Sequence, residues 1–286
     1  MADVPGFVGS RARAVKESSI RLGPGLSMAK ASPAESSGAE EAEGALARVW
    51  GAPSLPDWHA RVLGRFLGSA TDKAVKQGRD LINAAARLMR RLDPEELTMQ
   101  NIAAEAGVSV RVLYRHFEGK DDLLVALIEE SQIVFARLIE KATADIADPL
   151  ECLGEALHFA TTDARQRTDQ NFSRALARFT LQTSVTSPDK VGAAHRPVIL
   201  VLAGMVQDAI QSGQIEVGDA EVAASNLYNS YQAHQRNLYL GNSLGGPLPS
   251  SGELIRFCLL GLGAHIPPGW EKTLGQHTRR RTTVAS

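Results

Sequence analysis

The most informative segment of this chain reads Thr98-Met-Gln-Asn-Ile-Ala-Ala-Glu-Ala-Gly-Val-Ser-Val-Arg-Val-Leu-Tyr-Arg-His-Phe117. It predicts two short helices and a tight turn, because Thr98 and Ser109 can each cap a helix and Gly107 can adopt a left-handed backbone. Ala103 is small enough for the second helix to cross the first, and apolar contacts between them are expected from Ile102, Ala106, Val108 and Leu113. The spacing indicates a helix-turn-helix, although an ordinary helical hairpin of an all-α domain has similar spacing.

The chain on either side of this segment also follows a helical pattern. Apolar residues recur every three or four positions between 81 and 92, and Asp93-Pro94 ends this first helix. A long amphipathic helix is expected from Lys120 to about Ala147. Further helices are predicted at about 150–163, 169–184, 196–213, 219–240 and 252–264. The pattern predicts an all-α fold, in which a three-helix head is joined by a long fourth helix to a larger helical domain.

The two ends of the chain differ from its middle. Residues 1–44 are rich in Gly, Ser, Ala and Glu and are expected to be a disordered extension, since they offer little apolar surface to bury. Residues 45–72 are dense in apolar side chains, and the part from Trp58 to Leu67 predicts a short amphipathic helix packed on the protein. The head is expected at 73–119, the larger domain at 120–266, and a polar tail at 267–286 that carries Arg279-Arg280-Arg281.

Composition excludes several classes of protein. Hydrophobic residues make up 44% of the chain, and the longest apolar run, from Val198 to Val206, has nine residues, whereas a membrane-spanning helix needs roughly 18. Cys152 and Cys258 are too few for a disulfide framework and favour buried thiols in a reducing cytoplasm. The net charge of −1 still permits a local DNA-binding face, since residues 71–117 carry eight Lys or Arg against six Asp or Glu.

The sequence contains none of the common signatures of catalysis. Zinc-protease, nucleophile-elbow, phosphate-loop and paired-cysteine motifs are missing, and Gly261-Leu-Gly263 follows a predicted helix rather than the strand of a dinucleotide site. We therefore expect a protein that is not an enzyme, with no catalytic residues, no cofactor and no metal site.

One segment resembles a known family. Val108-Ser-Val-Arg-Val-Leu-Tyr-Arg-His-Phe-Glu-Gly-Lys-Asp-Asp-Leu-Leu124 is similar to the DNA-binding signature of the tetracycline-repressor (TetR) family, G-V-S-x-x-x-L-Y-x-H-F-x-x-K-x-x-L. The resemblance runs from about Gln77 to Leu127, and Gly119 departs from the Ser or Asn often found before the lysine. Beyond residue 150 only the architecture is similar, and residues 1–70 have no counterpart in the usual short member. The resemblance implies a transcription regulator with a DNA-binding head and a ligand-binding, dimerising domain.

The recognition helix of such a head begins at Ser109, Val110 and Arg111, which would enter the major groove. Arg111 is suited to a bidentate contact with guanine, and Val110 to a thymine methyl group. A solvated helix face is the alternative for these three residues. Lys73, Lys76 and Arg79 precede the apolar stripe of the first helix and are candidates for contacts with the DNA backbone or the minor groove.

Phosphate contacts are expected from a second set of residues. Thr98 can place its hydroxyl and its helix N-terminus against a phosphate. The resemblance places Tyr114, His116 and Lys120 at phosphate-contacting positions, and the alternative for the two aromatic residues is a partly buried, satisfied core position. Arg115 points between the two faces and stays ambiguous.

The larger domain is expected to hold the effector and the dimer interface. We expect a ligand site among the helices at 150–213, lined by Phe159, Phe172, Phe179, Gln182, Tyr231 and His234, although aromatic residues at helical spacing also serve as plain core. The lack of a charge cluster favours a mainly hydrophobic effector, and we expect a lipid or an acyl thioester. The resemblance implies a homodimer formed by helices 219–240 and 252–264, whose seam, or alternatively intrachain core, would contain Leu227, Tyr228, Tyr231, Leu238, Leu254, Phe257, Leu260 and Leu262.

These observations predict a cytoplasmic, ligand-responsive repressor that binds a palindromic double-stranded operator as a dimer and is released by a small effector. The alternative is a ligand-independent DNA-binding regulator that acts through a protein partner. A sizeable apolar cavity would favour the first of these functions over the second.

Overall fold

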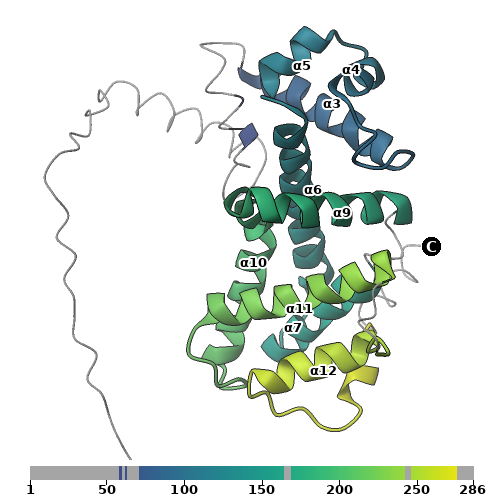
Figure 1. The fold of residues 1–286 in the computed structure, drawn as a ribbon. Helices are drawn as coiled ribbons and strands as arrows, with labels where there is room; N and C mark the ends of the chain where they lie inside the picture. Colours follow the sequence, from purple (N-terminus) through teal and green to yellow (C-terminus); the bar gives the residue numbers. More distant parts are fainter. Residues whose placement is uncertain (1–57, 60–61, 63–70, 164–168, 242–245, 276–286) are drawn as a thin grey trace, which may run out of the picture. The chain divides into compact units, whose positions relative to one another are not determined.

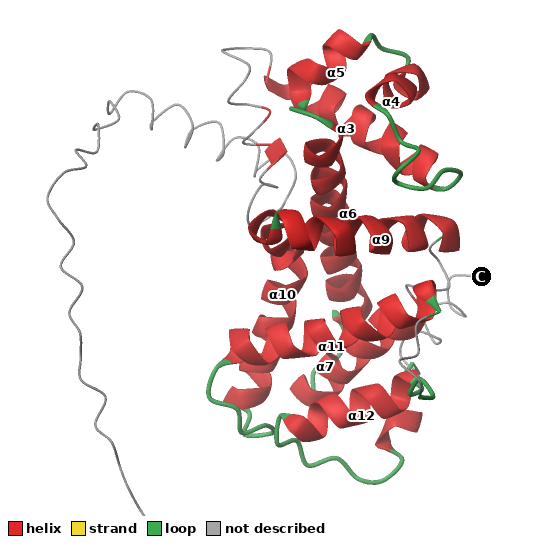
Figure 2. Cartoon of the chain, in the orientation of Figure 1, coloured by secondary structure: helices red, strands yellow, loops and turns green. Residues whose placement is uncertain are grey.

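The computed structural model of the chain describes residues 58–59, 62, 71–163, 169–241 and 246–275 (Figure 1). The predicted disordered extension at 1–44 lies outside these residues, as do most of 45–72 and the arginine run at 279–281. All of the described residues belong to one compact unit. Within the described ranges every regular element is helical (Figure 2), which confirms the predicted all-α fold.

The head consists of three helices, as the sequence predicts. These helices are α3 (Thr71–Met89), α4 (Met99–Ala106) and α5 (Val110–His116). The long helix α6 (Lys120–Thr143) begins after Gly119 and runs from the head into the larger domain (Figure 1). It ends four residues before the predicted Ala147.

In its described residues, the larger domain contains five further α-helices and two short helical segments. They are α7 (Pro149–His158), the π-helical η1 (Phe159–Asp163), α9 (Gln170–Thr186), α10 (Pro188–Gln211), α11 (Ala220–Leu240), α12 (Ser251–Gly261) and the 3₁₀ turn η2 (Trp270–Lys272). Among the described helices, α10 is long and apolar enough to cross a membrane. It instead packs against α6, α7, α9 and α11, which is the position of a core helix in a bundle.

Two hydrophobic cores hold these helices together. The first contains buried residues of α3, α4, α5 and the N-terminal half of α6, together with Ala175 and Phe179 of α9. The head therefore packs directly on α9 as well as on α6. The second core lies among α6, α7, α10, α11 and α12, and Leu153, Val206 and Leu259 are fully buried within it.

Two predicted boundaries are wrong. The helix predicted from 196 begins at Pro188, so that Pro197 lies inside α10 rather than in its first turn. The predicted polar tail begins too early, because residues 267–275 belong to the fold. The Trp270 ring lies so close to Gly154 that a side chain there would not fit, and the Gly275 N–H donates to the buried carboxylate of Glu155 at 2.7 Å.

Candidate DNA-binding head and ligand pocket

The turn between α4 and α5 has the geometry that the sequence predicts. The Thr98 hydroxyl accepts from the Asn101 N–H at 3.1 Å, and the Asn101 side chain accepts from the Thr98 N–H at 2.9 Å. This reciprocal cap fixes the start of α4. Gly107 ends α4 with φ of 68°, a left-handed conformation that favours glycine. Thr98 itself is exposed, so its hydroxyl proton remains available to a phosphate.

The first turn of α5 presents two unengaged polar side chains. Ser109 is the N-cap residue, yet its hydroxyl makes no capping hydrogen bond. Arg111 is exposed and has no hydrogen bond or ion pair within the described part of the chain. Val110 is half-buried and packs against the first core. The structure therefore leaves Ser109 and Arg111 open to solvent and gives Val110 a partly structural position.

Two aromatic residues near the end of α5 have opposite surroundings. The Tyr114 side chain is 53% exposed, whereas His116 is fully buried. His116 donates from Nε2 to Gln77 Oε1 at 2.9 Å, and the exposed Arg115 reaches the same oxygen at 3.5 Å. The predicted phosphate contact of His116 is therefore wrong, because its ring lies inside the head. The alternative, a buried core position, holds for His116 and fails for Tyr114.

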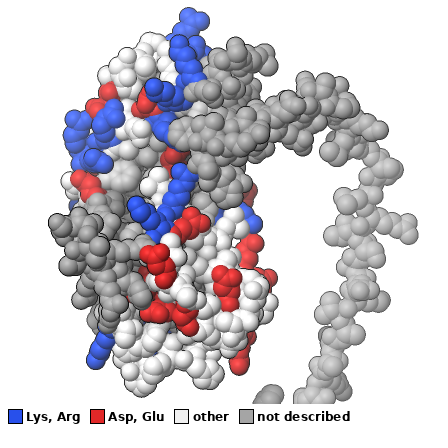
Figure 3. Space-filling view, turned by 180° about the vertical axis from the view of Figure 1, so that it is seen from behind, with Lys and Arg blue, Asp and Glu red and all other residues white. Residues whose placement is uncertain are grey.

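Lys120 is the first residue of α6, and its side chain binds the loop between α3 and α4. Its ammonium donates to the Pro94 carbonyl at 3.1 Å and is half-buried. An ammonium group has three N–H donors, so this bond leaves donors for a phosphate. On the face shown in Figure 3, most Lys and Arg side chains lie over the upper half, where the head is, and most Asp and Glu side chains over the lower half. The head is thus the more basic part of this face.

Trp58 packs between α3 and α6. We call this contact region, which contains Trp58, Gly78, Glu129 and Glu130, the joint between α3 and α6. Its backbone N–H donates to Glu129 at 2.8 Å, and its indole N–H donates to Glu130 at 3.0 Å. The fully buried ring covers Gly78 of α3, where an added Cβ would lie 2.7 Å from it, and its centroid is 6.3 Å from that of Phe117. The burial of Trp58 and Val62 confirms, for these residues, that the segment before the head packs on the protein.

Glu130 interacts electrostatically with two basic residues at this joint. Its carboxylate lies 3.5 Å from His59 Nε2 and 3.3 Å from an Arg79 guanidinium nitrogen. Burial raises the pKa of Glu130, but the His59 hydrogen bond and the Arg79 charge lower that pKa by more, so the carboxyl stays ionised at neutral pH. Arg79, a predicted candidate for DNA backbone contact, is therefore engaged in the joint.

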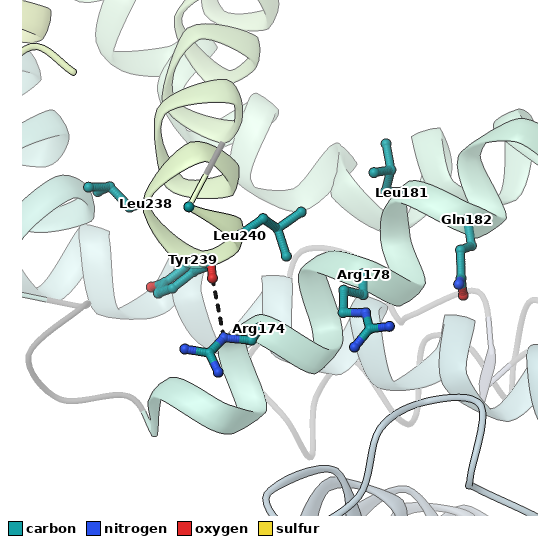
Figure 4. Close-up of a pocket in the computed structure, with 8 residues that line it drawn as sticks. Arg174, Arg178, Leu181, Gln182, Leu238, Tyr239 and Leu240 are labelled. Atoms are coloured by element: carbon teal, nitrogen blue, oxygen red, sulfur yellow. Dashed lines mark hydrogen bonds between the residues drawn. The ribbon is translucent and has the colours of Figure 1, made fainter. Parts of the chain in front are cut away.

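A pocket of about 660 Å³ lies between α9 and the C-terminal end of α11 (Figure 4). Arg174 and Arg178 stand one helical turn apart on α9, and Leu240 of α11 projects toward them. The lining residues are Arg174, Arg178, Leu181, Gln182, Leu238, Tyr239, Leu240 and Gly241. The wall of this pocket combines cationic, polar and apolar groups.

Of the six residues predicted to line a ligand site, only Gln182 contributes to this pocket. Phe179 is buried in the first core, and Phe172 packs against that core. Phe159 is buried in the second core, where the Phe135 ring stacks between Phe159 and Tyr231 at centroid distances of 6.5 and 5.9 Å. The remaining residue, His234, is also buried. These aromatic side chains fill the space between helices, which is the alternative that helical spacing left open.

Polar side chains link the pocket wall to the head, a feature that sequence reasoning missed. Arg178 lies 3.0 Å from Asp93 and 3.6 Å from Glu95, both in the loop between α3 and α4. Gln182 donates to Glu95 at 2.7 Å. The hydrogen bond from Gln182, followed by smaller effects that include the Arg178 charge, lowers the pKa of Glu95. No local pattern signals these contacts, because the partners are far apart in the sequence.

The larger domain also contains a buried polar chain. The Tyr228 hydroxyl donates to Gln132 Oε1 at 2.9 Å and lies 2.8 Å from His195 Nδ1. Because the phenol has one proton, His195 must donate from Nδ1 to the phenol oxygen. Burial lowers the pKa of His195 to about 4 and raises that of Tyr228, so both groups are neutral at pH 7.

Comparison with known proteins agrees with this geometry. The sequence profile described as "Bacterial regulatory proteins, tetR family" matches residues 81–127, from α3 into α6. The fatty acid metabolism regulator protein of Bacillus subtilis (strain 168) is 24% identical over 153 residues, which are 52% of this chain and 77% of the relative. An uncharacterized HTH-type transcriptional regulator of Mycobacterium tuberculosis (strain ATCC 25618 / H37Rv) is 29% identical over 187 residues, which are 64% of this chain and 74% of the relative.

Solved structures show the same fold. RolR without ligand aligns with a TM-score of 0.52 at 16% identity, over 73% of this chain and 96% of RolR. Thermus thermophilus FadR, a TetR-family repressor in complex with lauroyl-CoA, aligns with a TM-score of 0.52 at 18% identity, over 67% of this chain and 98% of FadR. The matched head, the relatives and the shared helical architecture lead to one conclusion: residues 81–127 match the head of the tetR family of bacterial regulatory proteins, and the chain has the fold of solved regulators of this kind.

Proposed function

We propose that this protein is a repressor that binds a palindromic operator as a homodimer and leaves it when a small, largely apolar effector binds. The observation that carries the DNA-binding part is the exposed first turn of α5. Ser109 and Arg111 project from it without partners in the described chain, while Thr98 and Gly107 fix its orientation. Binding to operator DNA implies that the protein acts in the cytoplasm.

Exposed apolar residues on α12 support the dimer. Phe257 is 74% exposed and Leu260 is 46% exposed, one helical turn apart, which suits a helix-packing interface better than a solvated surface. Leu227, Tyr228 and Leu262, also expected in the seam, are buried inside one chain. In a symmetric dimer the two α5 helices would lie roughly 34–36 Å apart, one turn of B-DNA.

The pocket and the relatives support an effector. Thermus thermophilus FadR is described in complex with lauroyl-CoA, and RolR in complex with resorcinol. The pocket between α9 and α11 offers apolar surface from Leu181, Leu238 and Leu240. A ligand-responsive regulator therefore explains more of the structure than a ligand-independent one. An acyl thioester remains our expected effector class.

Helix α6 connects the effector domain to the head. Its first residue, Lys120, is bonded to the head loop, and Ile139 near its other end is buried in the second core. A ligand that tilts the half of α6 around Val134 and Leu138 would change the separation of the two heads. The resulting loss of DNA affinity cannot exceed the ligand's preference for the tilted state, typically about 1–3 kcal/mol.

The test is operator selection from genomic fragments, followed by DNA-binding isotherms with and without lauroyl-CoA. We expect a palindromic site, dimer stoichiometry, and weaker operator binding in the presence of ligand. Linkage requires operator DNA to weaken lauroyl-CoA binding by the same factor. Lys190→Ala on α10, an exposed residue that belongs to neither the head nor the pocket wall, is the matched control for Arg111→Ala. Failure of the wild type to select any DNA sequence would overturn the proposed function.

A further inference from the structure

The pocket between α9 and α11 has an unbalanced charge. Arg174 donates from Nε to the Tyr239 carbonyl at 3.2 Å, and its terminal guanidinium nitrogens have no partner among the residues that the structure describes. None of the residues that line the pocket is acidic. A cation on a pocket wall without a neutralising carboxylate favours an anionic ligand group.

Apolar side chains share the same pocket. Leu181 of α9 and Leu238 and Leu240 of α11 contribute to its wall (Figure 4). A small anion alone would leave the apolar wall of the pocket exposed to water. An uncharged hydrocarbon would cover the guanidinium groups without neutralising their charge. A molecule with one anionic end and one apolar chain satisfies both halves of the wall.

The second arginine connects this wall to the DNA-binding head. Arg178 lines the pocket and also pairs with Asp93 at 3.0 Å and Glu95 at 3.6 Å. Its side chain is 40% exposed, and the two carboxylates are about half exposed. Exposed ion pairs of this kind are weak, so a ligand anion can replace them.

We propose that the pocket binds an amphipathic anion, a carboxylate or phosphate attached to an apolar chain, and that its charged end competes with Asp93 and Glu95 for Arg178. Occupation of the pocket then breaks the ion pairs of Arg178 with the loop between α3 and α4 and so weakens the contact of α9 with the head. This inference rests on the proposed function, because it names the chemistry of the effector and the contact through which it acts.

The first experiment measures ligand binding by the full-length protein without DNA. Titration calorimetry compares dodecyl phosphate, dodecanoate and 1-dodecanol, all below their micellar concentrations. We expect both anions to bind more tightly than dodecanol, and the stronger of the two identifies the charged group. Arg174→Gln should weaken the anions about tenfold, the loss expected for a charge-assisted hydrogen bond, and should leave dodecanol unchanged. Lys190→Gln is the control for loss of a remote positive charge.

Two outcomes of this titration would overturn the anion site. One is equal affinity for dodecanol and the two anions, and the other is an Arg174→Gln variant that binds the anions as the wild type does. Because no DNA is present, either result would overturn the anion site without testing the proposed repressor function, which depends on operator binding.

The second experiment tests the competition for Arg178. The double variant Asp93→Asn, Glu95→Gln removes the charges on the head, so dodecyl phosphate should bind it more tightly than the wild type. The same variant should show a smaller change in operator affinity when ligand is added, since the contact that the ligand breaks is already lost. Unchanged affinity for dodecyl phosphate would contradict the competition, even if operator binding persists.

Discussion

Arg111 and Lys120 both belong to the head, but their surroundings predict different contributions to DNA binding. Arg111 is exposed on the first turn of the recognition helix, so Arg111→Ala should cost about 1–3 kcal/mol on operator DNA and little on random DNA. Lys120 lies at a helix N-terminus beside Pro94. Lys120→Ala should therefore lower the affinity for both DNAs alike and reduce the slope of log affinity against log salt concentration by about one. Fluorescence anisotropy at two salt concentrations measures both effects. Equal losses on both DNAs for Arg111→Ala would make it a phosphate contact.

His195 makes the stability of the protein depend on pH. Burial lowers its folded-state pKa from 6.5 to about 4, so between these values the unfolded chain binds a proton that the folded chain does not. The free energy of unfolding should therefore fall as pH is lowered through this window, by about 1.4 kcal/mol for each pH unit. Urea denaturation at several pH values tests this. His195→Gln keeps a donor for Tyr228 without titrating, so an unchanged pH dependence in this variant would refute the assignment.

Single residues of the head and of α9 show what the sequence can and cannot predict about the site. Tyr114 and His116 both match phosphate-contacting positions of the family, yet two residues apart on a helix they point about 200° away from each other. Only one of them can lie on the exposed face of the helix, and that residue is Tyr114. The bond between Arg178 and Asp93 has no counterpart in any local pattern, because it depends on how α9 packs against the head.

At the scale of the elements, we expect Trp58 and Gly78 to be energetically coupled at the joint between α3 and α6. Trp58→Ala should cost about 3–5 kcal/mol, because it removes a fully buried indole. Gly78→Ala should destabilise the wild type, since the new methyl group meets a rigid ring at 2.7 Å, and should be much milder in the Trp58→Ala background. A double-mutant cycle in urea measures this coupling.

A second tryptophan provides the control for this cycle. Trp270 packs on Gly154 in α7, away from the joint. Trp270→Ala should destabilise the protein, but the cost of Gly78→Ala should be unchanged in that background. Additivity of the Trp58 and Gly78 substitutions would contradict the contact between them.

Element boundaries were predicted where local signals dominate and missed where packing does. Thr98 and Gly107 mark the ends of α4 because capping is a property of a few adjacent residues. Proline suits the first turn of a helix, and Pro188 takes that position in α10, whereas Pro197, next to the predicted start at 196, lies inside the helix. Residues 267–275 look polar, yet the contacts of Trp270 with α7 make them part of the fold.

At the scale of the whole molecule, the exposed face of α12 predicts the oligomeric state. Phe257→Glu with Leu260→Glu should convert a dimer into a monomer and reduce operator affinity by about a hundredfold or more, because the second head no longer binds in the same event. Light scattering after size exclusion measures the mass. Val185→Glu on α9 is the matched control, as Val185 is 80% exposed but lies on another helix. A dimer that survives the α12 substitutions would move the interface elsewhere.

The first hydrophobic core has a consequence for how the protein melts. Its buried residues come from every helix of the head and from α6 and α9 alike, with Ile102, Leu113, Leu124 and Phe179 in one cluster. Such a shared core couples the loss of one element to the loss of the others. Calorimetry should find no separate early melting of the head. A fragment of residues 71–119 should stay unfolded in far-ultraviolet circular dichroism, because it lacks Leu124, Phe179 and the other core residues of α6 and α9.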